Sequence, residues 1–247
     1  MVTGAGRGIG AAIATLLAQV GAALVVDDLQ HEPAAQTAAQ ITAEGGRAVA
    51  VAADVAADAG VEALMHAARD AFGDPTVLVN NAGVGRMDTP VAEIDGKEFR
   101  RILDINLTSQ FLCARAVLPA MVAAGYGRII NIGSRAWLGF PGESDYGAAK
   151  GGTVSLTRAL ALEVGRYGVT VNAVAPSAII TPAMENLPAA TRERLRTGHP
   201  GSRFGEPLDV ARAVRFLALP ASGAITGQLL YACGGRSLRG SSRAATQ

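Results

Sequence analysis

Short apolar runs alternate along the chain with longer segments whose apolar residues have the spacing of one helix face. Before Gly4, only Met1, Val2 and Thr3 remain to form a first strand. We therefore expect either a stunted central strand or a native protein with several more N-terminal residues. The apolar runs predict six strands: Leu24–Val26, Ala48–Ala52, Val77–Asn80, Arg128–Ile132, Thr170–Ala175 and Gln228–Tyr231. The segments between them predict six helices: Gly8–Val20, Pro33–Glu44, Ala59–Phe72, Gly96–Ala124, Asp145–Tyr167 and Pro207–Leu217.

The alternation of strand and helix predicts an α/β fold. With the first strand counted, it gives a doubly wound, mainly parallel sheet of seven strands with right-handed crossovers. The uninterrupted apolar run at 77–79 indicates a sheet with helices on both faces. At 247 residues, of which 49% are hydrophobic, we expect a single domain over residues 1–235. Residues 177–207 predict a substrate lid, and residues 236–247 a flexible tail.

A glycine-rich segment, TGAGRGIG at residues 3–10, leads into the first predicted helix, which begins at Gly8. Glycine lets the backbone turn tightly and approach a ligand, and the following helix N-terminus favours a pyrophosphate. The next predicted strand ends in Asp27 and Asp28, where a dinucleotide fold holds the adenosine ribose hydroxyls. An ordinary glycine-rich turn is the alternative. The order of glycines, helix, strand and acid favours a Rossmann-like cofactor site.

Tyr146 and Lys150 lie four residues apart in a predicted helix, and Ser134 lies twelve residues before the tyrosine. Positions i and i+4 share one helix face, so the phenol and the ammonium can meet. A fixed cation favours the phenolate, which suits proton transfer to or from an alcohol or carbonyl. Taken alone, the pair is also typical of a solvated helix face.

Composition excludes several classes of function. The net charge is +1, from 22 basic and 21 acidic residues, so we expect neither nucleic acid nor an anionic membrane as a partner. No uncharged run of about 18 apolar residues indicates a membrane span. Cys113 and Cys233 form no CxxC pair, which indicates a reducing cytoplasm, and the three histidines lack the spacing of metal ligands.

Over nearly its whole length, the chain resembles the short-chain dehydrogenase/reductase family. The glycine segment is similar to the family's TGxxxGxG loop, and residues 80–83 (NNAG) to the motif that follows its fourth strand. Asn106, Ser134, Tyr146 and Lys150 match the family's catalytic tetrad. The resemblance implies that Tyr146 protonates a carbonyl during reduction, with its pKa lowered by Lys150. It also implies that Ser134 binds the substrate oxygen and that Asn106 holds a water linked to Lys150.

The resemblance extends to a nicotinamide cofactor. Asp28 would accept from both ribose hydroxyls and repel a 2′-phosphate, which favours NAD over NADP, whereas Arg7 favours NADP. Two departures from the family pattern are Ser177, where glycine is usual, and Cys233, where aspartate is common. The residues implied to bind the cofactor are Gly4, Gly6, Arg7, Gly8, Ile9, Gly10, Asp28, Asp54, Val55, Asn81, Ala82, Gly83, Tyr146, Lys150, Pro176 and Thr181.

These features predict an NAD-linked dehydrogenase or reductase acting on a secondary alcohol or ketone. An alternative is a 3-oxoacyl-thioester reductase, because Arg86 and Arg135 near the predicted pocket suit a carboxylate or the phosphates of an acyl carrier. The alternative from another class is a non-catalytic NAD(H)-binding sensor, although such proteins usually lose part of the tetrad. The resemblance further implies a homotetramer, with the helices predicted at Gly96–Ala124 and Asp145–Tyr167 paired across one interface.

Overall fold

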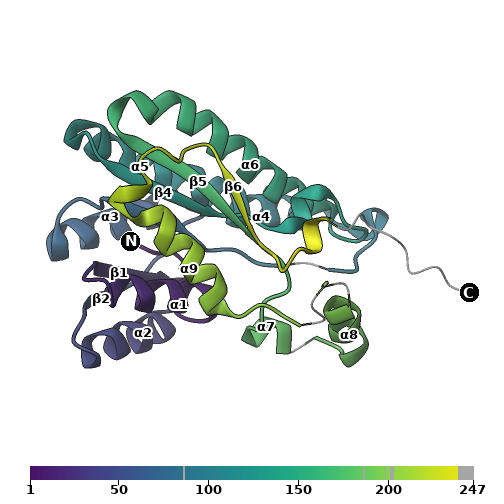
Figure 1. The fold of residues 1–247 in the computed structure, drawn as a ribbon. Coiled ribbons are helices and arrows are strands. Elements are labelled where there is room, and N and C mark those ends of the chain that lie inside the picture. Colours follow the sequence, from purple (N-terminus) through teal and green to yellow (C-terminus); the bar gives the residue numbers. More distant parts are fainter. Residues whose placement is uncertain (86, 186, 198, 201–202, 239–247) are drawn as a thin grey trace, which may run out of the picture.

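The structure is a computed structural model that describes residues 1–85, 87–185, 187–197, 199–200 and 203–238 (Figure 1). Its strands all run parallel, in the order β2-β1 and β3-β4-β5-β6. They are β1 (Ala23–Asp28), β2 (Arg47–Ala52), β3 (Val77–Asn80), β4 (Gly127–Ile132), β5 (Val169–Pro176) and β6 (Leu229–Ala232). The predicted bounds of these strands agree with the structure to within two residues at each end.

The expected seventh strand is reduced to a single bridging residue. Val2 pairs in parallel with Val26 of β1 and with Val79 of β3, so it joins the two parts of the sheet. The amide of Val2 donates to Val25 O and that of Thr3 to Val79 O, at 3.0 Å each. The described residues therefore form six strands and this bridge in place of a seven-stranded sheet. The stunted central strand that the sequence analysis gave as one alternative is what the structure shows.

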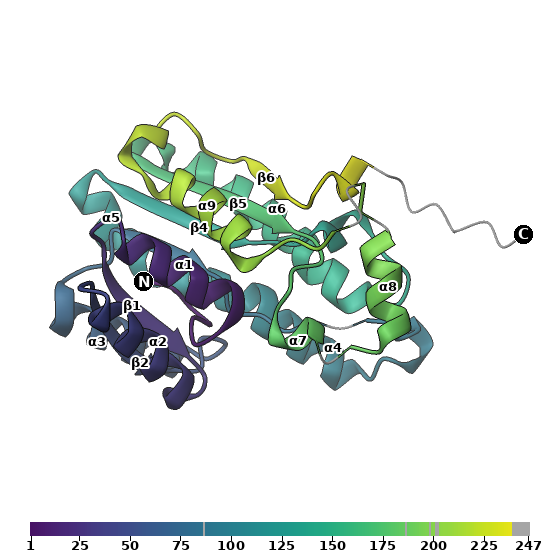
Figure 2. The ribbon, with the colours of Figure 1, turned by 60° about the horizontal axis from the view of Figure 1, so that its bottom comes forward.

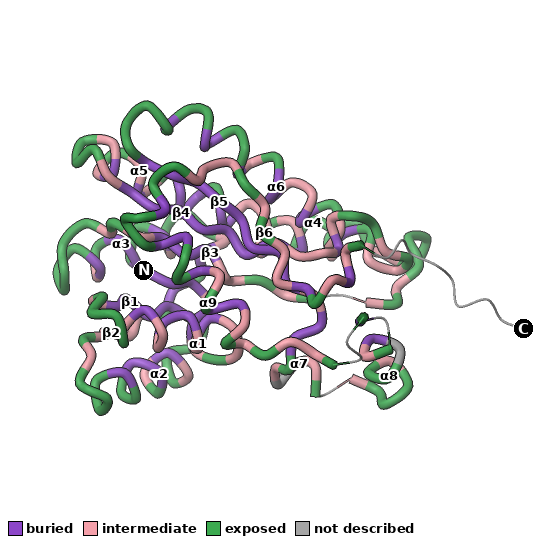
Figure 3. Tube along the Cα trace, viewed as in Figure 1, coloured by how far each residue is buried: buried purple, intermediate pink, exposed green. Residues whose placement is uncertain are grey.

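Helices cover both faces of the sheet, and each face has its own apolar core (Figures 1 and 2). One face carries α1 (Gly8–Ala18), α2 (His31–Ala43) and α9 (Pro207–Ala218). The other carries α3 (Asp58–Phe72), α5 (Ser109–Ala124) and α6 (Ser144–Val164). Neighbouring residues of one strand serve different cores: Ile129 of β4 packs with α5 and Ile130 with α1 and α9. The buried layer between exposed helix surfaces is visible in Figure 3.

A π-helical turn interrupts the long helix predicted at Gly96–Ala124. It spans Asp104–Thr108, between α4 (Gly96–Leu103) and α5. The extra residue in this turn places Asn106 inward, with no exposed surface. By length and composition Gly96–Ala124 could cross a membrane, but its α5 part packs on the sheet as a core helix does.

Buried amides connect the strand ends nearest the site. Asn80 Nδ2 on β3 donates to Asn131 Oδ1 on β4 at 2.9 Å, and Asn131 Nδ2 donates to Thr157 Oγ1 on α6 at 2.9 Å. Since all three side chains are buried, each bond forms without competition from water. The chain of bonds fixes α6 against the centre of the sheet.

The predicted lid contains two short helices, α7 (Pro182–Glu185) and α8 (Ala189–Thr197). At the start of the predicted tail, Arg236–Leu238 forms a 3₁₀ helix and Arg236 is 8% exposed. The rest of that tail, residues 239–247, lies outside the described residues, as does Arg86 of the predicted pocket.

Candidate functional site

The glycine loop is held where only glycine fits. Gly4 has φ +59°, and a Cβ on it would lie 2.8 Å from Ala82 Cα. A Cβ on Gly10 would lie 2.2 Å from Gly4 O. Arg7 is the N-cap residue of α1, and its side chain does not cap the helix. The first amides of α1 are therefore available to an anionic ligand in the cleft, as a pyrophosphate requires.

Asn81 ties the glycine loop to the end of β3. Its Nδ2 donates to Thr3 O at 3.0 Å and to Gly4 O at 2.8 Å. In return, Thr3 Oγ1 accepts from the backbone amides of Asn81 and Ala82, both at 3.0 Å. The side chain of Asn81 therefore positions the loop, in addition to lining the cleft.

Asp28 closes the adenosine side of the cleft. Its Oδ2 accepts from Gly6 N at 3.1 Å and its Oδ1 from Gln30 N at 3.2 Å. Arg7 Nη2 donates to Gln30 Oε1 at 2.8 Å, so the cation and the carboxylate lie on either side of Gln30. The carboxylate is thus fixed at the end of β1, where the sequence predicts a ribose contact.

A cavity of about 560 Å³ joins these elements to the tetrad. Two of the residues predicted to bind the cofactor, Gly6 and Gly10, do not line this cavity. A Cβ on Gly6 would lie 2.5 Å from Pro33 Cβ, so the absence of a side chain there is a packing requirement. The other predicted cofactor residues all line the cavity: Gly4, Arg7, Gly8, Ile9, Asp28, Asp54, Val55, Asn81, Ala82, Gly83, Tyr146, Lys150, Pro176 and Thr181.

Asn106 and Lys150 converge on Gly83. Asn106 Nδ2 donates to Ile102 O at 3.0 Å and to Val84 O at 3.1 Å, while its buried Oδ1 has no partner among the described residues. A Cβ on Gly83 would lie 2.7 Å from that Oδ1 and 3.6 Å from Lys150 Nζ. Asn106 thus presents an uncommitted acceptor close to the ammonium, which fits the predicted water site.

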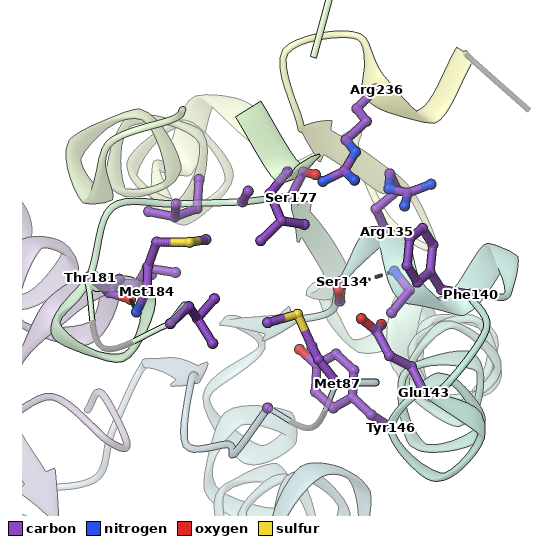
Figure 4. A pocket seen from close by; sticks show the side chains of 17 residues that line it. Met87, Ser134, Arg135, Phe140, Glu143, Tyr146, Ser177, Thr181, Met184 and Arg236 are labelled. Atoms are coloured by element: carbon purple, nitrogen blue, oxygen red, sulfur yellow. Dashed lines mark hydrogen bonds between the residues drawn. The ribbon is translucent and has the colours of Figure 1, made fainter. Parts of the chain in front are cut away.

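Ser134 and Tyr146 face one cavity from different elements. Ser134 follows β4 and its Oγ accepts from Ala136 N at 3.1 Å, which leaves its O–H free to donate. Tyr146 and Lys150 lie on one face of α6, with Nζ 5.6 Å from the ring centroid, and Nζ donates to Ile132 O at 3.0 Å. The hydroxyls of Ser134 and Tyr146 point into the pocket (Figure 4).

A second cavity, of about 430 Å³, opens from these two hydroxyls. Its wall is largely apolar, with Met184, Leu187 and Leu195 contributed by the predicted lid. Arg135 and Arg236 line the same cavity. No pattern in the sequence points to Arg236, because its place beside the pocket depends on the path of the chain after β6.

Comparison with known proteins agrees with this geometry. A family model described as Enoyl-(Acyl carrier protein) reductase matches residues 4–237. The chain belongs to the short-chain dehydrogenase/reductase family. It is therefore an oxidoreductase that acts on CH–OH or carbonyl groups with a nicotinamide cofactor.

Three relatives of this short-chain dehydrogenase/reductase align over almost their entire length. A 3-oxoacyl-(acyl-carrier-protein) reductase of Synechocystis sp. is 44% identical over 238 residues, 95% of each chain. A subunit of a hydroxy(phenyl)methylsuccinyl-CoA dehydrogenase of Thauera aromatica is 42% identical over 238 residues, 96% of each chain. A cis-4-hydroxycyclohexanecarboxylate dehydrogenase of Sinomonas cyclohexanicum is 41% identical over 236 residues, 95% of this chain and 94% of its own.

Burial is the largest effect on the pKa values of Tyr146 and Lys150. Burial raises the pKa of Tyr146 to about 12, and the charge of Glu143 adds to this rise. The hydrogen bond with Ser134 acts in the opposite direction and lowers it. Burial lowers the pKa of Lys150 to about 8. Burial is the largest of these effects on the phenol in this structure, and the lowering of its pKa by Lys150 stays a prediction. The phenol is thus protonated at neutral pH, as a proton donor must be.

The departures from the family pattern have different surroundings. Ser177, just beyond β5, lines both cavities. Cys233 is buried and its Sγ lies 3.2 Å from Ser237 Oγ, away from the tetrad. No group of three or more His, Cys, Asp or Glu that could hold a metal occurs among the described residues.

Asp27 is a buried acid at the floor of the cofactor cavity. It is 1% exposed, and its Oδ1 has no partner among the described residues. Burial, with smaller effects of Asp28 and Asp54, raises its pKa from 3.8 to about 7, although backbone hydrogen bonds from Gly4 and Ala53 oppose the rise. The sequence places this acid beside Asp28 but contains no sign of its burial.

Replacement of Asp27 by Asn should stabilise the protein at neutral pH. The native carboxyl keeps its proton up to pH about 7 while the unfolded chain loses it near 3.8, so wild-type stability falls as pH rises between these values. The difference in unfolding free energy, Asp27→Asn minus wild type, should grow across that range by at most about 4 kcal/mol. Urea denaturation at pH 4, 5.5, 7 and 8 measures this difference.

The control is Asp54→Asn, at an exposed acid of the same cavity. An equal, pH-independent difference in both variants would contradict the raised pKa of Asp27.

Proposed function

We propose that this enzyme transfers a hydride between a nicotinamide and a secondary alcohol or ketone, using Ser134, Tyr146, Lys150 and Asn106. One observation carries the proposal: the hydroxyls of Ser134 and Tyr146 lie where the cofactor cavity meets the apolar pocket. A carbonyl placed between these hydroxyls would face the cofactor cavity on one side and the pocket on the other. The two parts of the reaction, hydride and proton transfer, can then act on one C=O bond.

Each tetrad residue has a separate task in reduction. A bound nicotinamide supplies the hydride to the carbonyl carbon. Tyr146 donates its phenolic proton to the carbonyl oxygen, which completes the alcohol, and Ser134 donates a hydrogen bond to that oxygen. Lys150, which is charged below pH about 8, stabilises the phenolate left behind. The free Oδ1 of Asn106 accepts a hydrogen bond from a water, through which a proton returns by way of Lys150 to Tyr146.

A 3-oxoacyl-thioester reductase is the second candidate. The Synechocystis relative carries that name at 44% identity, and such a reaction would use the same tetrad. The relatives named for a CoA-linked and a cyclic carboxylate dehydrogenase support the alcohol or ketone proposal instead. The candidates differ in substrate, so a panel with 3-oxoacyl thioesters, cyclic ketones and aryl ketones separates them.

Tyr146→Phe should reduce kcat/KM for the best substrate of that panel by about 10²–10⁴-fold, because the proton donor is lost. Its affinity for NADH, measured by fluorescence, should change little. Tyr167→Phe, at a tyrosine that is 38% exposed, is the matched control and should retain turnover. Turnover that survives Tyr146→Phe would refute the assigned role, and NADH binding without turnover of any carbonyl by wild type would favour a sensor.

We also propose NAD as the preferred cofactor. Support comes from the Asp28 carboxylate, which is fixed by Gly6 and Gln30 in the cofactor cavity and would repel a 2′-phosphate. The opposing feature is Arg7, whose guanidinium is held by Gln30 on the same side.

Asp28→Asn should shift this preference while it keeps an acceptor for Gly6 N. We expect the ratio of kcat/KM for NAD⁺ to that for NADP⁺ to exceed about ten in wild type and to fall about tenfold or more in the variant. Glu32→Gln, which removes a nearby exposed charge on α2, should leave the ratio unchanged. A wild-type preference for NADP⁺ would show that Arg7 dominates.

The proposed assembly is a homotetramer. Phe111 on α5 and Leu162 on α6 are 44% and 87% exposed, on the two helices expected at one interface. Four chains of 25.1 kDa give about 100 kDa, the mass expected from sedimentation velocity at micromolar concentration. Leu162→Glu should shift that mass downward, because it places a charge in an apolar interface. An active wild-type monomer would refute the tetramer.

A further inference from the structure

Two arginines lie on one side of the substrate cavity, although they are about 100 positions apart in the sequence. Arg135 follows Ser134 directly, and Arg236 lies in the 3₁₀ helix beyond β6. Their guanidinium carbons are 5.3 Å and 6.0 Å from the centroid of the same ring, Phe140. Figure 4 shows both guanidinium groups near Phe140, with Thr181 and Met184 across the cavity.

This side of the cavity carries two cationic side chains. Arg135 is half-buried, and no carboxylate of the described residues lies within ion-pair distance of it. Arg236 is 8% exposed, so water screens its charge weakly. Burial lowers the pKa of His199, and Arg236, Arg135 and Arg203 lower it further.

The acid that lines the pocket lies toward the catalytic hydroxyls. Glu143 precedes α6, and its charge raises the pKa of Tyr146. Among the described residues, two cations and one carboxylate therefore line the cavity, and the carboxylate lies near Ser134 and Tyr146 (Figure 4). An anion bound on this side of the cavity would be attracted by both guanidinium groups.

We propose that Arg135 and Arg236 bind a carboxylate carried by the substrate itself, while its carbonyl or hydroxyl lies between Ser134 and Tyr146. The substrate class is then a compact keto acid or hydroxy acid whose hydrocarbon part packs on the apolar lid residues. This inference rests on the proposed function and specifies its substrate. A guanidinium group suits it because its planar set of N–H donors matches a carboxylate in two-point contact.

The position of the arginines favours a substrate carboxylate over the phosphates of an acyl carrier. Both line the cavity of about 430 Å³ that also holds Ser134 and Tyr146, a volume typical of a small-ligand site. Arg236 has too little exposed surface to meet a group that stays outside the cavity. A carrier phosphate would require cations on the outer surface instead.

The test measures binding without turnover. Calorimetry on the NADH-bound enzyme gives Kd for cyclohexanecarboxylate and for cyclohexanecarboxamide, which match in size and cannot be reduced by the cofactor. We expect wild type to bind the acid about tenfold more tightly or better than the amide. Arg135→Leu and Arg236→Leu should each bring that ratio toward one.

Arg47→Leu is the matched control, because Arg47 makes a similar contact with Phe72, at 5.9 Å from the ring centroid, far from the pocket. It should keep the wild-type ratio. Since Arg236 is buried, circular dichroism must show that its variant is folded, and half-buried Arg135 gives an independent result.

A wild-type ratio near one, failure to bind either compound, or an unchanged ratio in Arg135→Leu overturns the proposal. So does a loss of affinity for coenzyme A, with acid binding retained, because that would assign the arginines to carrier phosphates. Any of these results leaves the hydride-transfer proposal standing if carbonyl substrates are turned over. Selective acid binding with no turnover would overturn the proposed function alone.

Discussion

The close approach of the glycine loop to the segment after β3 is the constraint on which the rest of the structure depends. Thr3 and Asn81 exchange hydrogen bonds across it, and the absence of a Cβ at Gly4 lets Ala82 lie against the loop. The same contact continues the bridge at Val2, which joins the two parts of the sheet. One set of backbone contacts therefore holds the sheet together and aims the amides of α1 into the cofactor cavity. A side chain at Gly4 or Gly10 would disturb both the fold and the site.

Burial gives the site its chemistry. One cavity is lined by four polar groups: Asp27, Asn106, Tyr146 and Lys150. The pKa of each of the three titratable groups is shifted in the direction that favours its neutral form. Such groups cost stability unless a partner or ligand satisfies them. The cavity thus holds acceptors and donors prepared for a polar ligand, and Asn106 Oδ1 and Asp27 Oδ1 are the clearest cases. The π-helical turn serves this arrangement, because it directs Asn106 inward from a helix that otherwise packs by apolar contacts.

The sequence predicts those features that depend on short-range patterns of residues. The glycine segment, the i, i+4 spacing of Tyr146 and Lys150, and the apolar periodicity are short-range patterns, and the strands and helices they predict occur. The burial of Asp27, the π-helical turn and the place of Arg236 each depend on contacts between distant segments, for which no short pattern exists. The seventh strand is present only as the bridge at Val2, which pairs with β1 on one side and β3 on the other, as the short run before Gly4 indicated. The burial of Tyr146, which raises its pKa, is likewise absent from the i, i+4 spacing that pairs it with Lys150.

The cofactor cavity and the substrate cavity are lined largely by different parts of the chain. Residues near the glycine loop, β3 and α6 form the cofactor cavity and carry the proposed reaction. The substrate cavity shares Ser134 and Tyr146 with it but is otherwise lined largely by the segments after β4, β5 and β6. Asn106, Tyr146 and Lys150 lie on helical elements outside these late segments, so side chains there can change without loss of these three residues. It follows that a charge such as that of Arg236, placed by the last turn before the end of the described chain, can select a substrate while the mechanism stays fixed.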